Sequence, residues 1–490
     1  MTIFVNDPFY PAPDVPLYRA LYLHLRKAIL SGALKGGLKL PATRTLAEEL
    51  NLSRNTVLNA YRQLSAEGYL ESIDGSGTFV SKELPDLLLT APHPEAPEHS
   101  TTKGPAGGQP HFSERAKAQI AAALAPSNGK LPRPFLSEAP ALDVFPYKLW
   151  SRLVIRQARR LPVNTYAYQD SAGYRPLREA IAAHVAVSRQ VHCQAEQIMI
   201  VPGSQGALDL AARMLLDPGD TVWLEDPGYP GARGAFLGAG ANIIPVPVDD
   251  EGLVVSSGIS QAPQARLVYL TPSHQFPLGV TMSLSRRLAL LDWAKHANAY
   301  LLEDDYDSEF RFGTRPLAAL QGLDDADLVI YIGTFSKVLF PSLRIGYLIL
   351  PPALVDPFMK VRRQIDVHTA LLEQAVLADF ITEGHFTRHL RRMRTLYAER
   401  RKLFLEATQG LPLEIHSPEA GIHCVGWLPD GLDDLSVARK AAAYDLELTP
   451  ISIFSIKPLT RKGLLLGYGG YNAKTIRDAA HRLEALLRSM

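Results

Sequence analysis

The apolar positions of the first 80 residues predict three helices followed by a hairpin. Residues 15–34 carry leucine and isoleucine at intervals of three and four, the spacing of one helical face. A shorter helical pattern covers residues 40–51, and a third runs through 52–70 with Ser53 as a natural N-cap. The segment ESIDGSGTFV at 71–80 predicts two strands joined by a glycine-rich turn.

The next stretch of the chain has a different pattern. Residues 81–130 are dense in proline, alanine, glycine and histidine and show little apolar periodicity, which is typical of a linker. Within them, AKAQIAAALA at 116–125 predicts one short helix. We therefore expect two folded regions joined by a linker of about 50 residues.

From residue 131 onward, short apolar runs alternate with amphipathic helical segments. The helical patterns include residues 204–216 and 284–297. The apolar runs lie at 197–203, 220–230, 265–272, 299–307, 328–337 and 344–350. This alternation predicts an α/β domain, a mostly parallel sheet covered by helices on both faces. Ligands of such sheets gather at the carboxyl ends of the strands.

Composition adds few constraints to this organisation. The chain has 490 residues and a formal net charge of +1, so any contact with nucleic acid must come from a local patch. The two cysteines, Cys193 and Cys424, are expected to be reduced thiols, and neither a disulfide framework nor a metal site is indicated. The N-terminal segment lacks the features of a signal peptide, and no apolar run reaches bilayer length. We expect a cytoplasmic protein.

Two phrases in the first region carry a resemblance to a known family. LPATRTLA at 40–47 and GSGTFV at 75–80 resemble the LPSxRxLA and GxGTFV phrases of GntR-type regulators, whose fold is a winged helix-turn-helix. The resemblance implies that the helix beginning after Ser53 enters the major groove, with Arg54 and Asn55 facing base edges. The wing glycines, Gly75 and Gly77, would approach the minor groove. Predicted phosphate contacts are Ser53, Thr56, Tyr61 and Arg44, although Arg44 could also contact a base.

The strongest chemical signal lies at 333–348. GTFSKVLFPSLRIGYL resembles the SKxxxPGxRxG signature of fold-type I enzymes that use pyridoxal 5'-phosphate (PLP), with Ser342 where glycine is usual. The resemblance makes Lys337 the catalytic lysine that forms a Schiff base with PLP. It also makes Arg344 and Thr334 ligands of the cofactor phosphate.

Four further segments supply the remaining predicted cofactor contacts. Backbone N–H groups at Ser204 and Gln205, at the start of a predicted helix, suit a phosphate. The ring of Tyr229 matches the one that stacks on the pyridine. An aspartate at 304 would keep the ring nitrogen protonated, and Tyr306, two residues along the same strand, faces the same side. Tyr168 matches a tyrosine that reaches the cofactor of the neighbouring subunit. Asp305 should point away.

The whole arrangement resembles the MocR/GabR-type subfamily of GntR regulators. It implies a DNA-binding domain at 1–80, a linker at 81–130 and an aminotransferase-like, PLP-binding effector domain at 131–490. The large part of the latter would cover about 165–375 and the small α+β part about 376–490 with 131–160. The resemblance also implies a homodimer with two partners, operator DNA and an effector, which could be an amine, an amino acid or PLP itself.

Two positions depart from the aminotransferase pattern. Phe276 replaces the asparagine that bonds the ring hydroxyl of the cofactor, which leaves Tyr306, or His274 or Gln275, as the partner. Leu465 replaces the arginine that holds the substrate α-carboxylate, and the nearby Arg461 could face outward. We therefore expect a ligand-sensing regulator with at most weak transaminase activity. The alternatives are a working aminotransferase that regulates its own gene and, less favoured, an architectural DNA-binding protein.

Overall fold

The structure is a computed structural model that divides into two units, Met1–Gln109 and Pro110–Met490. It describes residues 9, 15–73, 75–82, 84, 111–123, 133–137, 139–312, 317–418 and 420–490, without the side chains of residues 164 and 166. Most of the predicted linker, 85–110 and 124–130, lies outside the described residues.

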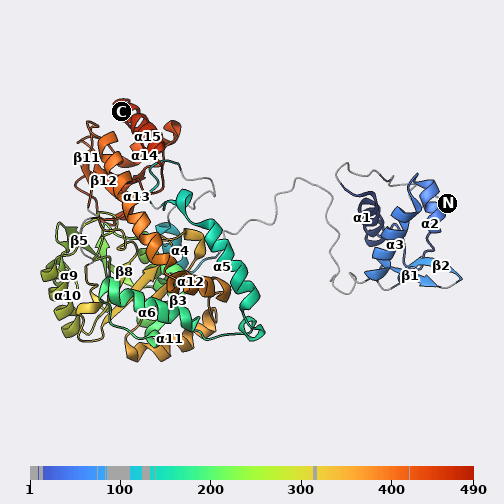
Figure 1. The fold of residues 1–490 in the computed structure, drawn as a ribbon, viewed down its shortest axis with the longest axis horizontal. Coiled ribbons are helices and arrows are strands. Elements are labelled where there is room, and N and C mark those ends of the chain that lie inside the picture. The colour runs from blue at the N-terminus through green and yellow to red at the C-terminus, as the bar shows by residue number, and fades with distance from the viewer. Residues whose placement is uncertain are drawn as a thin grey trace. The chain divides into compact units, whose positions relative to one another are not determined.

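The first unit has the predicted order of helices and strands (Figure 1). Its elements are α1 (Leu17–Leu30), α2 (Thr43–Glu49), α3 (Arg54–Ala66), β1 (Leu70–Ile73) and β2 (Gly77–Val80). The two strands form the antiparallel hairpin expected for the wing. Leu25 of α1 and Val57 of α3 are fully buried in a common core. Ser53 caps α3 as predicted, since its hydroxyl accepts a hydrogen bond from the Thr56 amide at 3.1 Å.

A mixed eight-stranded sheet forms the centre of the second unit. Its strands, in spatial order, are β3 (Ile198–Val201), β10 (Gly346–Ile349), β9 (Val329–Thr334), β8 (Tyr300–Asp305), β7 (Leu267–Leu270), β4 (Thr221–Asp226), β5 (Asn242–Asp249) and β6 (Gly252–Leu253). The run from β9 to β5 is parallel, as expected. β10 is antiparallel to both of its neighbours, and β6 is antiparallel to β5, which the sequence pattern did not predict.

Helices cover both faces of this sheet, which confirms the α/β prediction. They are α6 (Arg175–Arg189), α7 (Gly203–Leu215), α8 (Pro230–Ala239), α9 (Val255–Gln261), α10 (Leu284–Ala297), α11 (Pro352–Ile365) and α12 (Leu371–Thr382). Alternate residues of β9 serve the two faces. Ile330 and Ile332 pack with the buried residues of α7, α8 and α11, whereas Tyr331 packs with those of α6 and α12.

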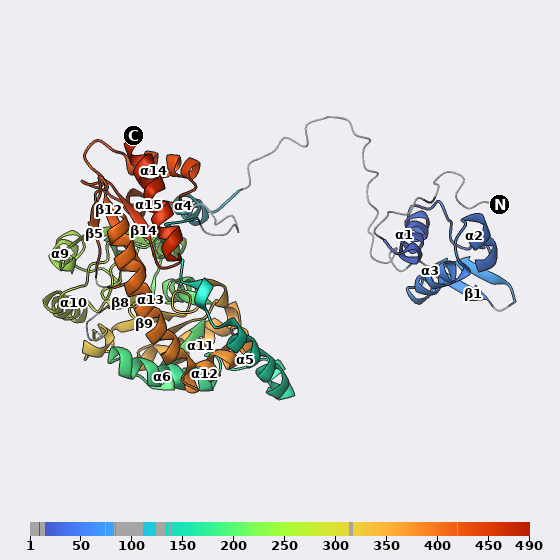
Figure 2. The same cartoon turned by 45° about the horizontal axis from the view of Figure 1, so that its top comes forward.

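A smaller lobe follows in sequence and stands beside the large sheet (Figure 2). Its four strands, in spatial order, are β11 (Glu414–His416), β12 (His423–Trp427), β14 (Gly463–Gly467) and β13 (Thr449–Pro450). Its helices are α14 (Asp434–Ala441) and α15 (Ala473–Arg488). The long helix α13 (His385–Ala407) joins the lobes, because Phe386 packs in the core of the large lobe and Phe404 in that of the small lobe. Phe135, from the start of this unit, forms a bridge to Gly467 and is buried in the core of the lobe.

Two segments near the start of the second unit pack differently from the sequence-based expectation. The helix α5 (Tyr147–Arg160) packs on α12 and shares a core with α6, so it belongs to the large lobe although the sequence placed it with the small part. Within the predicted linker, the expected short helix is α4 (Glu114–Ala122), and it lies on α8. The Gln119 side chain donates to the Gly234 carbonyl at 3.0 Å.

Short 3₁₀ turns complete the secondary structure. They lie at Leu142–Val144, Val163–Tyr166, Ala195–Gln197, Gln321–Leu323, Pro341–Leu343, Ala442–Tyr444 and Ile451–Phe454. Across the described ranges, the helices are too short or too polar to cross a lipid bilayer.

Candidate functional site

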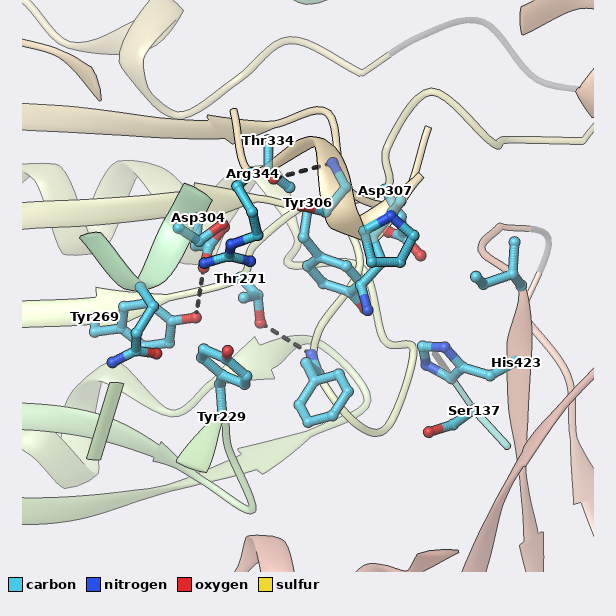
Figure 3. A pocket seen from close by; sticks show the side chains of 17 residues that line it. Ser137, Tyr229, Tyr269, Thr271, Asp304, Tyr306, Asp307, Thr334, Arg344 and His423 are labelled. Carbon is cyan, nitrogen blue, oxygen red and sulfur yellow. Dashed lines mark hydrogen bonds between the residues drawn. The ribbon is translucent and has the colours of Figure 1, made fainter. Parts of the chain in front are cut away.

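One pocket collects the residues that the sequence assigned to the cofactor (Figure 3). Its cavity of about 170 Å³ lies at the carboxyl ends of the strands β4, β8 and β9, where ligands of such sheets are expected. Eight of the nine predicted cofactor contacts line it: Lys337, Asp304, Tyr306, Tyr229, Ser204, Gln205, Thr334 and Arg344. Sequence segments up to 140 residues apart thus meet in one place.

Asp304, at the end of β8, forms the back of the pocket. Its Oδ2 accepts a hydrogen bond from the Tyr269 hydroxyl at 2.9 Å, while its Oδ1 is buried and has no partner among the described residues. Burial raises the pKa of Asp304 to about 7, against the opposing hydrogen bond from Tyr269. The carboxyl therefore presents one unsatisfied oxygen to the cavity, and a ligand N–H would satisfy it.

Tyr269 itself was missed by the sequence analysis. It lies inside the apolar strand β7 and is 1% exposed, so the sequence gives it the character of an ordinary core residue. Only the pairing of β7 with β8 reveals that its hydroxyl holds Asp304.

A second corner of the pocket is built for an anion. The helix α7 begins at Gly203, so the first backbone N–H groups of the helix are directed at this corner. Arg344 donates to the Pro202 carbonyl at 2.9 Å, and a Cβ atom at Gly203 would lie 3.1 Å from its guanidinium. Gly203 also has a φ of +79°, so glycine is required here for both conformation and close approach. The Thr334 hydroxyl accepts from the Ser336 amide at 3.2 Å.

The opposite end of the pocket is formed by the loop that follows β8 and by the small lobe. The Tyr306 hydroxyl lies 2.9 Å from Nδ1 of His274, and the same nitrogen lies 2.9 Å from Oδ1 of Asp307. The ring of Phe276 meets the ring of Tyr229 edge-on, with the centroids 5.8 Å apart. His423 of β12 completes this end.

Of the three side chains suggested in place of the missing asparagine, one faces the cavity. Gln275 is buried outside the pocket and donates its amide to the Pro227 carbonyl at 2.9 Å, so it does not face the cavity. His274 acts behind Tyr306 and does not line the pocket either. Among the three suggested side chains, Tyr306 alone lines the cavity.

Leu465, which replaces the usual carboxylate-binding arginine, also has apolar surroundings in the structure. Leu465 is fully buried and packs with Phe276, Val425, Ile451 and Phe454. Arg461 faces outward, where its guanidinium pairs with the Glu414 carboxylate and lies 5.1 Å from the centroid of the Trp427 ring. It lies outside the pocket that holds Lys337.

Two predicted positions lie away from the pocket. Asp305 points to the other side of β8, as expected, and pairs with buried Arg189 at 2.6 Å. Tyr168 is 85% exposed and does not line the pocket of its own chain. Its predicted reach into a neighbouring subunit stays a prediction.

In the first unit, the predicted DNA contacts divide into exposed and buried residues. Arg44, Arg54 and Asn55 are at the surface, and Gly75 and Gly77 have φ values of +76° and +115° in the wing. The environment of Tyr61 does not favour the phosphate contact predicted for it. Tyr61 is 4% exposed, and its hydroxyl donates to the Pro41 carbonyl at 3.0 Å, so it holds the start of α2 against α3.

The pocket fits PLP on three counts. The unpartnered oxygen of Asp304 suits a pyridinium N–H, the α7 corner with Arg344 suits a phosphate, and Lys337 lines the same cavity. Each group of the cofactor has a complementary protein group in the place where the signature residues meet.

Comparison with known proteins agrees with this geometry. Residues 17–80 match the family of bacterial regulatory proteins of the gntR type, and residues 154–482 match aminotransferase class I and II. The probable rhizopine catabolism regulatory protein MocR of Rhizobium meliloti is 42% identical over 479 residues, which cover 96% of this chain and 94% of that protein. The HTH-type pyridoxine biosynthesis transcriptional regulator PdxR of Corynebacterium glutamicum is 31% identical, over 92% of each chain.

A solved structure extends the comparison to the cofactor. LysN, an alpha-aminoadipate aminotransferase of Thermus thermophilus complexed with N-(5'-phosphopyridoxyl)-L-leucine, superposes with a TM-score of 0.69 at 29% identity. The match covers 77% of this chain and 97% of LysN. The chain therefore belongs to the MocR-like transcriptional regulators, in which a GntR-type helix-turn-helix domain is joined to a PLP-binding domain of the aminotransferase class I and II family.

Proposed function

We propose that this regulator senses a primary amine, an amino acid or PLP itself at Lys337, and that occupation of this site changes its binding to operator DNA. The observation that carries the proposal is the pairing of a complete PLP pocket with an apolar Leu465 where an aminotransferase has its carboxylate anchor. Such a site keeps the chemistry that captures an amine while it lacks a grip on the common α-amino acid substrates.

The proposed roles of the pocket residues follow from their positions. When bound, PLP supplies a carbonyl carbon that forms a Schiff base with amines and a pyridine ring that acts as an electron sink. Lys337 would hold this carbon through its Nζ, the group with which an effector amine would compete. Asp304 would keep the ring nitrogen protonated, Tyr229 would hold the face of the ring, and Tyr306 would be the partner of the ring hydroxyl. The phosphate ligands are Arg344, Thr334 and the amides of Ser204 and Gln205.

The DNA-binding roles rest on the docking geometry of helix-turn-helix proteins. Arg54 and Asn55, at the start of α3, are proposed to contact bases. Ser53, Thr56 and Arg44 would hold phosphates and set the register, and the wing at Gly75 and Gly77 would approach the minor groove. The protein would act in the cytoplasm, where its DNA is found.

We also propose a homodimer with two-fold symmetry. The exposed Tyr168 supports it, because a tyrosine at the surface of one chain is available to a site in another. In the dimer, each PLP pocket would receive Tyr168 of the partner subunit.

A working aminotransferase is the second candidate, and the intact set of Lys337, Asp304 and Arg344 favours it. A steady-state assay of oxo-acid formation over a panel of amino acids separates the two. Rapid turnover would favour the enzyme, whereas binding without turnover would favour the regulator.

The central experiment measures operator binding of the full-length, PLP-loaded protein with and without a panel of amines and amino acids. The operator is obtained by selection from random duplex DNA. We expect at least one compound to shift the affinity of the wild type by about fivefold to a hundredfold, the usual range of allosteric coupling. The Lys337→Ala variant should bind the same operator and fail to respond. A variant that responds as the wild type does would exclude sensing at Lys337.

A further inference from the structure

The small-lobe end of the pocket carries hydrogen-bonding groups that the cofactor does not need. His423 of β12 lines the cavity and is 3% exposed, yet its Nε2 is buried without a hydrogen-bond partner among the described residues. Ser137 lines the same end and is 4% exposed (Figure 3). Burying the His423 nitrogen without a partner costs free energy, so its retention here, beside the Ser137 hydroxyl, indicates a ligand.

The charges at this end do not suit a carboxylate. The cationic side chains among the described lining residues are Lys337 and Arg344, and both belong to the cofactor corner. Asp307 lines the small-lobe end and would repel an anion, while Leu465 offers no charge behind it. Burial, together with nearby His274 and Lys337, lowers the pKa of His423 well below its ordinary value. The imidazole is therefore neutral, with one nitrogen that donates and one that accepts.

Neighbouring rings fix the position of His423. The centroid of the His274 ring lies 5.2 Å away, and that of Phe276 lies 6.1 Å away. His274 is itself held by the Asp307 carboxylate, which only accepts hydrogen bonds, so Nδ1 of His274 carries a proton. His274 and Phe276 thus act as positioning residues for His423.

We infer that Ser137 and His423 form a specificity subsite for a hydroxyl group of the effector, so that the preferred ligand is a primary amine bearing neutral hydroxyls and not an amino acid. The inference rests on the proposed capture of the amine nitrogen at Lys337. A hydroxyl suits both partners, because it donates to an imidazole nitrogen and accepts from the serine hydroxyl. A carboxylate would only accept, and it would lie next to Asp307.

The test compares three compounds that share one carbon skeleton. 2-Amino-1,3-propanediol has two hydroxyls, isopropylamine has none, and L-serine has a carboxylate in place of one hydroxymethyl group. Each is titrated into the PLP-loaded full chain, and binding is followed by the visible absorption of the bound cofactor and by the shift in melting temperature. We expect the diol to bind about tenfold more tightly than isopropylamine, as one or two net hydrogen bonds allow, and serine no more tightly than isopropylamine.

Variants assign the preference to the two side chains. The preference is measured as the affinity for 2-amino-1,3-propanediol divided by the affinity for isopropylamine. His423→Phe and Ser137→Ala should each reduce this ratio about fivefold, and His423→Asn should keep part of the preference. The ratio is taken within one protein, so a general loss of binding cancels. Arg461→Ala is the matched control, because Arg461 lies at the surface outside this pocket, and it should leave the ratio unchanged.

The outcomes separate the subsite from the function on which it depends. A wild type that binds all three compounds equally, or prefers serine, overturns the subsite and leaves amine sensing intact. A ratio that both His423→Phe and Ser137→Ala leave unchanged also overturns it. If none of the compounds changes the absorption of the bound cofactor, capture of small amines at Lys337 is wrong, and the subsite falls with it.

Discussion

Among the described residues, the Asp304 carboxyl has a hydrogen-bond partner at only one of its two oxygens. Tyr269 binds one oxygen, and the other is buried and faces the cavity. A buried carboxylate with a free oxygen lowers the stability of the protein without ligand, because its charge is poorly solvated. The same lack of solvent strengthens its hydrogen bond to a cationic ligand and so raises the affinity for that ligand. Stability and ligand affinity are thus opposed at this one position.

The buried Asp304 carboxyl predicts that the unfolding free energy of the PLP-free protein depends on pH. Burial raises the pKa of Asp304 to about 7, whereas an aspartate in an unfolded chain titrates near about 4. Between these values the folded protein keeps a proton that the unfolded chain releases. The contribution of this group to stability is therefore complete below about pH 4 and is lost as the pH rises through 7. Without PLP, Asp304→Asn should be more stable than the wild type at pH 8.5, by on the order of 1 kcal/mol or more, and closer to it at pH 5.

Urea unfolding of the PLP-free proteins at both pH values measures this difference. Burial also raises the pKa of Glu225 to about 7, and the Asp304 charge adds to that rise. Asp304→Asn therefore lowers the Glu225 pKa as well, which adds to the stabilisation expected at pH 8.5. Tyr269→Phe provides the opposite comparison, because it removes the hydrogen bond that favours the charged carboxyl and should steepen the loss of stability with pH. A gap between wild type and Asp304→Asn that is equal at the two pH values would contradict the assignment. The Asn variant should also retain PLP less well.

At the scale of helices and strands, the sequence predicted what depends on local pattern. The three helices and the wing of the first unit follow from periodicity, the Ser53 cap and the glycines, and the strand ends that carry Asp304 and Lys337 follow from apolar runs. The antiparallel β10 was not predictable, because an apolar run has no direction until its neighbours are known. The same reason explains why Ser137 and His423 were missed, since they reach the pocket only through the packing of the small lobe.

The helix α3 also shows that a sequence pattern does not give the partner that a side chain meets after folding. Its apolar stripe was predicted, and Tyr61 belongs to that stripe, but the sequence also suggested that its hydroxyl would reach DNA. Folding places that hydroxyl on the Pro41 carbonyl instead. The face that remains for DNA begins at the N-terminal turn, where Arg54 and Asn55 are exposed directly after the N-cap residue Ser53.

This division of α3 predicts separate effects of substitutions on the two faces. Arg54→Ala and Asn55→Ala should each cost about 1–3 kcal/mol of discrimination between the operator and unrelated DNA, because each would remove a proposed bidentate base contact. Tyr61→Phe should leave this discrimination unchanged. It should lower the unfolding free energy of the DNA-binding domain by about 1 kcal/mol, because it removes one buried hydrogen bond. Competition binding with the selected operator and a scrambled duplex, alongside thermal unfolding, measures both. Loss of discrimination in Tyr61→Phe would return this residue to the interface.

At the scale of the whole molecule, the pocket contains eight of the nine predicted cofactor contacts, and the ninth is at the surface. Within one chain, Tyr168 has no part in the site. Its proposed role therefore requires a second chain. Within one chain of the proposed dimer, a substitution at Lys337 would affect that chain's own pocket, whereas a substitution at Tyr168 would affect the pocket of the partner subunit.

Subunit complementation tests this arrangement. Homodimers of Lys337→Ala should hold no PLP that borohydride can fix, and homodimers of Tyr168→Phe should release PLP about tenfold faster than the wild type, as expected for one lost hydrogen bond to a charged group. A heterodimer of the two variants has one site with both lesions and one with neither. It should therefore fix one PLP per dimer and release it at the wild-type rate. The matched control pairs Lys337→Ala with Asp304→Asn, whose lesions lie in the pocket of the same chain, so every site keeps one lesion and no wild-type rate returns. Release from the first heterodimer at the rate of the Tyr168→Phe homodimer would show that each pocket is completed within its own chain.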